Sequence, residues 1–190
     1  KEYPNTKNKI LVTLPARITR WKGQEDFISL ILKLKDDFPD IHGLIVGDAQ
    51  KGKKKFLKSL RAKVKLNNLS DDITFTGHRV DIKEIMLISK IVFSLSNEPE
   101  AFGRVSLEAL SLGIPVIAYS HGGVEEQLKK ILPSGLVTKN SNQLLYEKTK
   151  KFLIQPPIPK KNNHFLLKNM LENTLNIYFI GIKLNNKDRY

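Results

Sequence analysis

The stretch EPEAFGRVSLEALSLGIP, from Glu98 to Pro115, places two glutamates on either side of a strand-to-helix turn. Glu100 lies just before a Phe-Gly pair, and Glu108 follows eight residues later in a segment whose apolar residues recur at helical spacing. A helix N-terminus carries unpaired N–H groups and a positive dipole, so this turn would favour a phosphate or a sugar oxygen. The two carboxylates would then hold hydroxyl groups on both sides of a bound molecule.

A simpler interpretation stays open on spacing alone. Glu108 could pair with Arg104 one helical turn earlier on the surface, and Glu100 could be solvated. In the ligand-binding interpretation, Gly103 would allow a ligand to approach the backbone closely.

Short runs rich in β-branched residues alternate with longer amphipathic segments along the chain. The expected strands are Ile10–Leu14, His42–Val46, Ile73–Thr76, Ile91–Leu95, Pro115–Ala118 and Gly135–Val137. The expected helices are Gln24–Lys35, Lys54–Lys65, Asp81–Ile88, Arg104–Leu112, Gly123–Lys130 and Asn142–Leu153. Alternating strands and helices form a parallel sheet with helices on both faces. The sequence therefore predicts an α/β fold, a single Rossmann-like domain over residues 1–155, with ligands at the carboxyl ends of the strands.

Local signals refine the helix ends and the tail. Asp81 followed by Glu84 matches a capping box, and Gly113 lies where a helix-ending glycine is expected. The Pro- and Lys-rich segment IQPPIPKKNNHF is typical of an exposed connector. A last helix is expected at Phe165–Ile182, so residues 156–190 form a connector and a C-terminal helix that packs on the same domain.

Composition limits the class of protein. The chain has 190 residues, enough for one domain, and no apolar run approaches the ~20 residues of a membrane-spanning helix. It has no cysteine, which excludes a disulfide scaffold and a thiolate metal site. The net charge of +13 fits an anionic partner, but the lysines are spread along the chain and could equally be a general bias. No RNA-binding motif with interleaved aromatics is present, so no nucleic acid is expected.

A second motif, PARITRWKGQ (Pro15–Gln24), follows the first expected strand. Its Arg17 and Lys22 would lie at the same edge of the sheet as Glu100. Two cations and a helix N-terminus around one cleft fit a pyrophosphate and could neutralise it without a metal. The alternative is ordinary surface charge in a lysine-rich chain.

Together, PARITRWKGQ and EAFGRVSLEALSLGIPVIAYSHGGVEE closely resemble the C-terminal, nucleotide-sugar-binding half of retaining GT-B glycosyltransferases, family 4 (glycosyl transferases group 1). The family's signature of two glutamates separated by seven residues matches Glu100 and Glu108, and its Arg and Lys pair matches Arg17 and Lys22. FTGHRVDIKEI (residues 75–85) matches the loop that borders the nucleotide base. The resemblance covers about residues 9–155. It implies transfer of a sugar, with retention, from a nucleoside diphosphate to a glycan or lipid-linked acceptor in surface polysaccharide or lipopolysaccharide synthesis.

The resemblance also implies roles for the matching residues. Arg17 and Lys22 would bind the pyrophosphate of the donor and offset the charge on the departing nucleoside diphosphate. Glu100 would hold hydroxyls of the donor sugar and would act with these two cations as the catalytic group. Glu108 would bind the ribose.

The resemblance implies further contacts in the donor site. The backbone of Phe102, Gly103 and Arg104 would touch the sugar and the phosphate. The loop from Arg79 to Asp81 would flank the base. In addition, the pair Gly122-Gly123 would shape the loop after the next strand.

The implied ligand is a UDP- or GDP-linked sugar, with no metal and no other cofactor. GT-B enzymes have two Rossmann-like halves, and the half that holds the acceptor has no counterpart in this sequence. The chain starts without Met or a signal-peptide pattern, and we expect it to be part of a longer protein. The missing N-terminal GT-B domain is the expected partner, and a second chain that supplies it stays open. We expect a cytoplasmic protein, with peripheral contact at the inner face of an anionic membrane as an open alternative.

Motifs elsewhere in the sequence indicate other possible functions. GDAQKGKK (residues 47–54) almost matches a phosphate-binding P-loop but has Lys54 where a magnesium-binding Ser or Thr is required. The histidines are scattered, although His121 lies close to the expected cleft. A non-catalytic nucleotide-sugar-binding module and a related GT-B enzyme, such as a sugar-nucleotide epimerase, stay open. The sequence of an upstream segment would separate these alternatives.

Overall fold

The computed structural model describes residues 4–50, 52 and 54–187. Within these residues, six parallel strands form one sheet in the order β3-β2-β1-β4-β5-β6. The strands are β1 (Ile10–Pro15), β2 (Ile41–Val46), β3 (Ile73–Gly77), β4 (Ile91–Ser94), β5 (Val116–Tyr119) and β6 (Leu136–Val137). The helices are α1 (Gln24–Leu34), α2 (Lys54–Leu66), α3 (Ile82–Leu87), α4 (Arg104–Ser111), α5 (Gly122–Ile131), α6 (Asn142–Ile154) and α7 (Leu167–Lys187), with 3-10 turns η1 (Pro4–Thr6) and η2 (Pro133–Gly135). The predicted α/β, Rossmann-like fold is confirmed.

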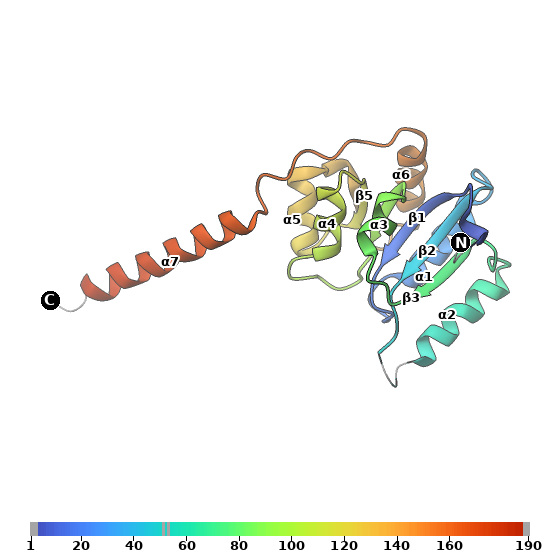
Figure 1. Ribbon diagram of the computed structural model, residues 1–190, viewed down its shortest axis with the longest axis horizontal. Helices are drawn as coiled ribbons and strands as arrows, with labels where there is room; N and C mark the ends of the chain where they lie inside the picture. Colours follow the sequence, from blue (N-terminus) through green and yellow to red (C-terminus); the bar gives the residue numbers. More distant parts are fainter. Residues whose placement is uncertain (1–3, 51, 53, 188–190) are drawn as a thin grey trace. The chain divides into compact units, whose positions relative to one another are not determined.

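The sequence pattern located the elements of the sheet to within one residue at each end. Except in the edge strand β3, the strands are largely buried on both faces, because α1, α2 and α6 pack on one side and α3, α4 and α5 on the other (Figure 1). Phe27 on α1 and Phe93 on β4 meet edge to face in the core, with ring centroids 5.4 Å apart. The side chains buried beneath the carboxyl ends of the strands are therefore mainly apolar.

The helix-end predictions had mixed outcomes. Gly113 ends α4 in the left-handed conformation at φ 78°, and its N–H donates to the Leu110 carbonyl at 3.0 Å, as a helix-ending glycine should. The capping box at Asp81 is wrong. Asp81 is the N-cap residue of α3, but its carboxylate makes no capping hydrogen bond, because it is bound to Arg79 instead.

The chain divides into two units, one ending at Lys160 and one beginning at Lys161. The second unit contains α7, which begins two residues later than predicted and runs to Lys187. Many of its apolar side chains are exposed, among them Leu171, Leu175 and Tyr178. Packing of this helix on the first unit stays a prediction.

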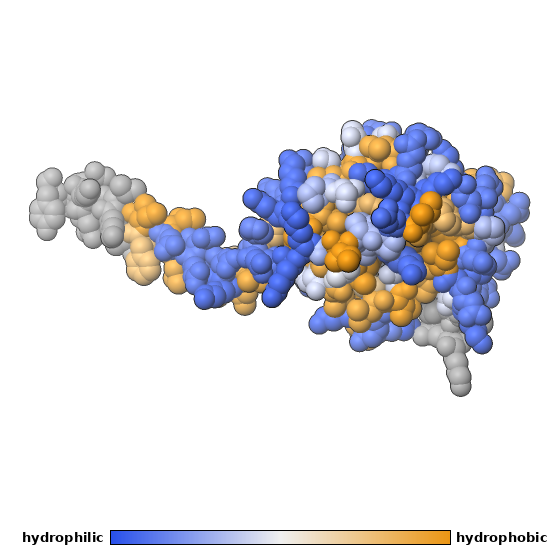
Figure 2. Space-filling model, turned by 90° about the horizontal axis from the view of Figure 1, so that it is seen from above, coloured by the Kyte–Doolittle hydropathy of each residue, from blue (hydrophilic) through white to orange (hydrophobic). Residues whose placement is uncertain are grey.

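Figure 2 shows hydrophobic residues gathered in the middle of one face of the first unit and bordered by hydrophilic ones. None of the described helices combines the length and the apolarity needed to cross a bilayer.

Candidate functional site

The order of the strands creates a crevice between β1 and β4. The chain leaves β1 toward one edge of the sheet and leaves β4 toward the other, so the loops after these two strands diverge from a common point. The β1–α1 loop contains Arg17 and Lys22, and the β4–α4 loop contains Glu100. Ligands of open α/β sheets bind at such a point.

The two loops touch through their backbones. Gly23 has φ 74°, and a Cβ atom there would lie 2.1 Å from the carbonyl oxygen of Leu95, so only glycine fits. The N–H of Asn97 donates to the carbonyl of Trp21 at 2.6 Å. These contacts bring Lys22 to Glu100.

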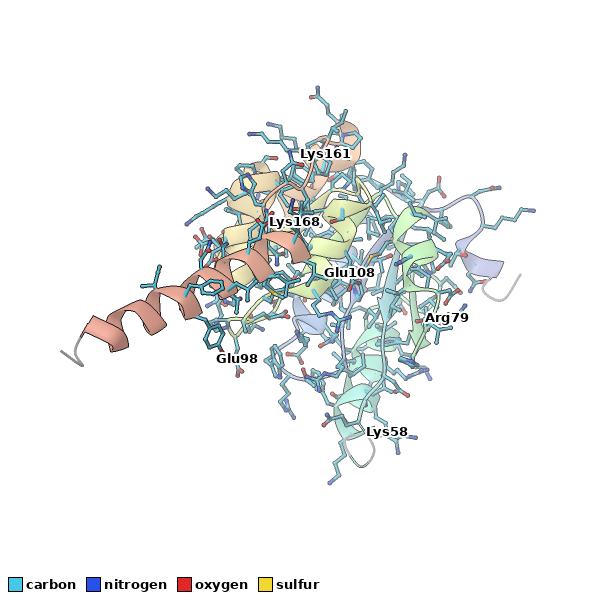
Figure 3. The ribbon with its side chains drawn as sticks, turned by 60° about the vertical axis from the view of Figure 1, so that its left-hand side comes forward. Lys58, Arg79, Glu98, Glu108, Lys161 and Lys168 are labelled. Atoms are coloured by element: carbon cyan, nitrogen blue, oxygen red, sulfur yellow. The ribbon has the colours of Figure 1, made fainter. Side chains whose placement is uncertain are left out.

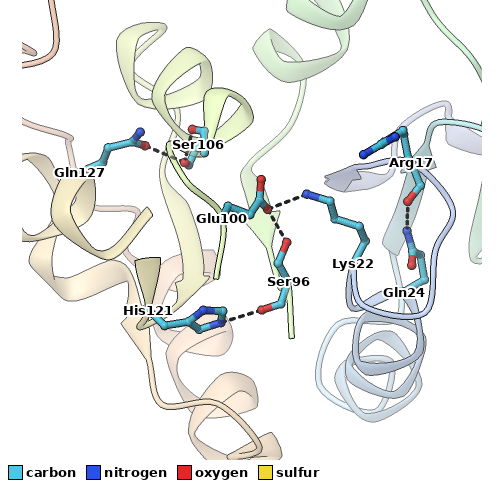
Figure 4. Close-up of polar contacts among 9 residues, drawn as sticks. Arg17, Lys22, Gln24, Ser96, Glu100, Ser106, His121 and Gln127 are labelled. Atoms are coloured by element: carbon cyan, nitrogen blue, oxygen red, sulfur yellow. Dashed lines mark hydrogen bonds and ion pairs between the residues drawn. The ribbon is translucent and has the colours of Figure 1, made fainter. Parts of the chain in front are cut away.

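Lys22 and Glu100 form a largely buried ion pair (Figure 4). Lys22 Nζ lies 2.8 Å from Glu100 Oε1, and the two side chains are only 13% and 21% exposed. The hydroxyl of Ser96 donates to the same carboxylate oxygen. The ammonium group also lies 4.1 Å from the ring centroid of Trp21. A solvated Glu100 is therefore excluded.

His121, at the start of α5, contacts this network through the backbone of Ser96. Its Nε2 lies 2.8 Å from the carbonyl oxygen of Ser96 and must donate to it. Its Nδ1 is buried and has no hydrogen-bond partner among the described residues.

Gly122 and Gly123, predicted to shape the loop after β5, also lie against the loop that carries Glu100. The N–H of Gly123 donates to the carbonyl of Glu100 at 2.8 Å. A Cβ at Gly123 would lie 2.5 Å from the carbonyl oxygen of Ala101, and one at Gly122 would lie 2.6 Å from that of Glu100. The absence of side chains lets the start of α5 lie directly against the loop that carries Glu100.

A larger, open cleft of about 720 Å³ lies beside this network. Its wall comes from the ends of β1, β2 and β3 and from the start of α4. It contains three of the predicted cations and the second glutamate of the signature: Arg17, Arg79, Arg104 and Glu108. Arg79 and Glu108 are labelled in Figure 3. Lys22 and Glu100 do not line it, so the predicted site consists of two neighbouring regions.

Arg79 and Asp81 bind each other within one loop. Arg79 Nε and one of its terminal nitrogens lie 2.8 and 2.7 Å from the two carboxylate oxygens of Asp81. These hydrogen bonds hold the pKa of Asp81 below its usual value, against the opposing effect of burial. Arg79 lines the cleft whereas Asp81 does not, so a base in the cleft would meet the arginine rather than the carboxylate.

Glu108 pairs with Arg104 one helical turn earlier, as in the simpler interpretation, but the contact between them is long. Arg104 lies 3.6 Å from Glu108, and its side chain is 85% exposed. Such exposed pairs contribute little to stability. Both side chains are therefore able to turn toward a ligand in the cleft.

The backbone at Phe102 and Gly103 is less open than predicted. The Phe102 carbonyl accepts a hydrogen bond from the side-chain amide of Gln127. A Cβ at Gly103 would lie 2.3 Å from a methyl group of Val124, so packing against α5 already explains this glycine. Close approach of a ligand to Gly103 stays a prediction.

The P-loop alternative does not fit the loop after β2, although Lys51 and Lys53 lie outside the described residues. The Gly47 N–H donates to the Gly77 carbonyl, and the Ala49 N–H donates to the Asp48 carboxylate. These amides are therefore not free to hold a phosphate. Across the described residues, no group of three or more His, Asp or Glu side chains could hold a metal ion.

Sequence reasoning missed the polar side chains that support the site. Ser96 and Gln127 hold the β4–α4 loop, and Gln24 holds the β1–α1 loop through a 2.9 Å bond to the Arg17 carbonyl (Figure 4). Ser and Gln are too common in loops and helices for their spacing to give a signal.

Comparison with known proteins gives one family. The family model for glycosyl transferases group 1 matches residues 1–168. N-acetyl-alpha-D-glucosaminyl L-malate synthase of Bacillus anthracis is 28% identical over 129 residues, which is 68% of this chain and 32% of that protein. A glycosyltransferase structure from Rickettsia africae superposes with a TM-score of 0.78 at 29% identity, covering 90% of this chain and 48% of that one.

A third comparison concerns a ligand complex. The structure of Anabaena Alr3699/HepE in complex with UDP and glucose superposes with a TM-score of 0.73 at 29% identity, covering 79% of this chain and 40% of that one. The chain thus spans less than half the length of these relatives. It belongs to the glycosyl transferases group 1 family and has the Rossmann-like fold of the C-terminal half of a GT-B glycosyltransferase.

Proposed function

We propose that this chain is the donor-binding half of a retaining glycosyltransferase that uses a nucleoside-diphosphate sugar. The observation that supports this most is the open cleft with Arg17, Arg79 and Arg104 at the point where the strand order reverses. Its position beside the Lys22–Glu100 pair allows one ligand to meet both regions. A UDP complex of a structural relative supports the same ligand class.

The nucleoside diphosphate would occupy the open cleft. Arg17, Arg104 and the N-terminal amides of α4 would bind the pyrophosphate, since guanidinium groups and a helix N-terminus favour phosphate oxygens. Glu108 would accept hydrogen bonds from the ribose, and Arg79 would flank the base. Together they offset the charge of the leaving group.

The donor sugar would lie over Glu100. A carboxylate has about four acceptor positions, so Glu100 can accept sugar hydroxyls while it keeps Ser96 and Lys22. Lys22 would add positive charge on the side of the pyrophosphate. Surface polysaccharide or lipopolysaccharide synthesis is the process we propose for the complete enzyme.

Calorimetric titration of the chain with UDP, GDP and ADP tests the cleft. At least one should bind, and Arg17→Ala should weaken binding by about 1.5–3 kcal/mol, the contribution of a hydrogen bond to a charged group. Arg61→Ala is the matched control, because Arg61 is also an exposed arginine but lies on α2. Absence of binding at millimolar nucleotide, or equal effects of the two variants, would refute the proposal.

Metal independence follows as a second expectation. Cationic side chains and a helix N-terminus take the place of a divalent ion at the pyrophosphate. Chelator should therefore leave nucleotide affinity unchanged in the same titration. A strict magnesium requirement would argue for a different phosphate site.

The acceptor site belongs, in this proposal, to an N-terminal GT-B half. Holding the acceptor against the anomeric carbon can supply about 7–11 kcal/mol of the barrier, so residues 1–190 alone should not transfer sugar. Adding that half, in cis or as a second chain, should give activity that Glu100→Ala and Lys22→Ala remove. Donor binding without activity in the reassembled protein would instead identify a non-catalytic binding module.

The cellular location is also a proposal. We expect the complete protein in the cytoplasm, with or without peripheral contact to an anionic membrane. Cell fractionation, with a high-salt wash of the membrane fraction, distinguishes the two.

A further inference from the structure

We propose that His121 is a positioning residue that fixes the carboxylate of Glu100 for the donor sugar, acting through Ser96. The inference rests on the proposed function and adds to it a residue for which the sequence favours a structural role. It concerns only the group formed by Lys22, Glu100, Ser96 and His121, which we call the closed network, and not the nucleotide cleft.

A continuous set of contacts connects the imidazole to the carboxylate (Figure 4). His121 Nε2 donates to the Ser96 carbonyl at 2.8 Å, and the Ser96 hydroxyl donates to Glu100. Ser96 is 6% exposed and follows β4 closely, at the start of the loop that carries Glu100. The ring therefore holds the residue that orients the carboxylate.

The rest of that loop is held by its backbone. Asn97 is bound through its N–H to Trp21 and through its carbonyl to the side chain of Lys139. The Glu100 carbonyl accepts from the Gly123 N–H. These bonds fix the path of the chain but leave side-chain rotation at Glu100 free. Ser96 and Lys22 limit that rotation through their contacts with the carboxylate, and His121 fixes the backbone of Ser96, from which its hydroxyl reaches Glu100.

The unpaired nitrogen of His121 supports a functional constraint. In the neutral ring with Nε2 protonated, Nδ1 is an acceptor, and here it is buried without a partner among the described residues. An unsatisfied buried acceptor costs free energy, and such groups call for an explanation. A requirement for the Nε2–H donor would explain why a histidine stands here, because an apolar side chain could not donate a hydrogen bond to the Ser96 carbonyl.

Substitutions separate donation from packing. Gln at position 121 can place its amide nitrogen close to the position that Nε2 occupies in His121. The Asn side chain is too short to do this, and Ala has no donor. The measurement is the ratio of affinities for a nucleotide sugar and its nucleotide, with UDP-glucose against UDP and GDP-mannose against GDP as the probes. Urea unfolding of each variant identifies any loss of folding.

We expect His121→Ala and His121→Asn to weaken nucleotide-sugar binding about tenfold, and His121→Gln to recover most of that loss. Affinity for the nucleotide alone should stay within about twofold, because the cleft does not contain His121. An equal loss for nucleotide and nucleotide sugar, or a His121→Gln variant that folds normally but binds like His121→Ala, would overturn the proposal.

A crystal structure of unliganded His121→Ala tests the inference independently of any ligand. Ser96 and the Glu100 carboxylate should shift, with loss of the Ser96–Glu100 hydrogen bond. Unchanged positions would overturn the inference even if no nucleotide binds, whereas absence of nucleotide binding with the expected shift would refute only the proposed function.

Discussion

The two regions of the site differ in how their charges are satisfied. In the open cleft, Arg17 is exposed and Arg104 has only a loose partner, so a phosphate can bind these cations without displacing a strong contact. In the closed network, Lys22 and Glu100 are largely buried and bound to each other. A charged ligand can therefore bind in the cleft without breaking a strong contact. In the network, a ligand has to bind groups that already hydrogen-bond to each other. We therefore expect the cleft to supply affinity and the network to supply selectivity for the sugar.

The largest effect should come from the packing of α5 against the network. In Gly123→Ala the new Cβ would lie 2.5 Å from the Ala101 carbonyl oxygen and 2.8 Å from the Phe102 Cα, so backbone has to move. We expect a loss of about 3 kcal/mol in the free energy of unfolding, at the upper end for overpacking. Urea denaturation followed by circular dichroism measures it.

The control for this substitution is Gly113→Ala. Gly113 has a left-handed φ of 78° but open space around it, so its alanine variant should lose only about 1 kcal/mol. If Gly123→Ala were no worse than this control, the close packing of α5 against the loop would not be the feature that holds the network.

A smaller loss is expected at the buried polar pair beneath the Glu100 loop. The hydroxyl of Ser106 lies 2.8 Å from both the Gly103 carbonyl and Gln127 Oε1, and Ser106 and Gln127 are fully buried. Ser106→Ala removes the hydroxyl from Gln127 Oε1 and leaves the Gly103 carbonyl with only the 3.3 Å bond from the Leu107 N–H, so it should cost about 1–3 kcal/mol in urea denaturation.

Ser111→Ala, near the C-terminal end of α4 and exposed, is the matched control and should be neutral or slightly stabilising. Equal unfolding midpoints for the two variants would show that the buried hydroxyl is not needed to hold the start of α4.

Periodicity predicted the fold well because burial on both faces of a parallel sheet leaves strong apolar runs, as in β2 (Ile41–Val46), where every residue is buried. The predicted strands also placed Arg17, Lys22 and Glu100 at one edge of the sheet, because these residues follow the carboxyl ends of β1 and β4. Their partners were not predictable. Glu100 binds Lys22 only because Gly23 and Leu95 bring the two loops into contact, which is a tertiary distance.

The wrong prediction at Asp81 has the same origin. A capping box is a local preference of about 1 kcal/mol, and a bidentate arginine two residues away competes with it. Sequence spacing shows that both partners are within reach but not which one the backbone of the loop favours.

Salt should separate the two regions at the level of binding. Exposed charges are screened by added salt, while buried pairs are screened much less. Between about 0.05 M and about 0.5 M NaCl, we expect affinity for the nucleoside diphosphate to fall about fivefold. The additional affinity that the sugar brings should change by less than about twofold. Titrations of nucleotide and nucleotide sugar at both concentrations measure the two effects, and equal salt dependence would remove the distinction drawn between cleft and network.

The smallest effect should be the pH dependence of the Arg79–Asp81 pair, of which only the arginine lines the open cleft. Hydrogen bonds from Arg79 lower the pKa of Asp81 in the folded protein, so the pair stabilises the fold above the carboxyl pKa of the unfolded chain, about 3.9, and this contribution is lost as pH falls through the lower folded pKa. Wild type should therefore exceed Asp81→Asn in urea midpoint slightly near pH 6, and the difference should shrink as the pH falls below about 3.9. Asp36→Asn is the control, since Asp36 is exposed and has no cationic partner within the described part of the chain. A difference that grows as the pH is lowered would have the wrong sign for a carboxylate held by an arginine, and would show that this pair does not keep Arg79 in place at the cleft.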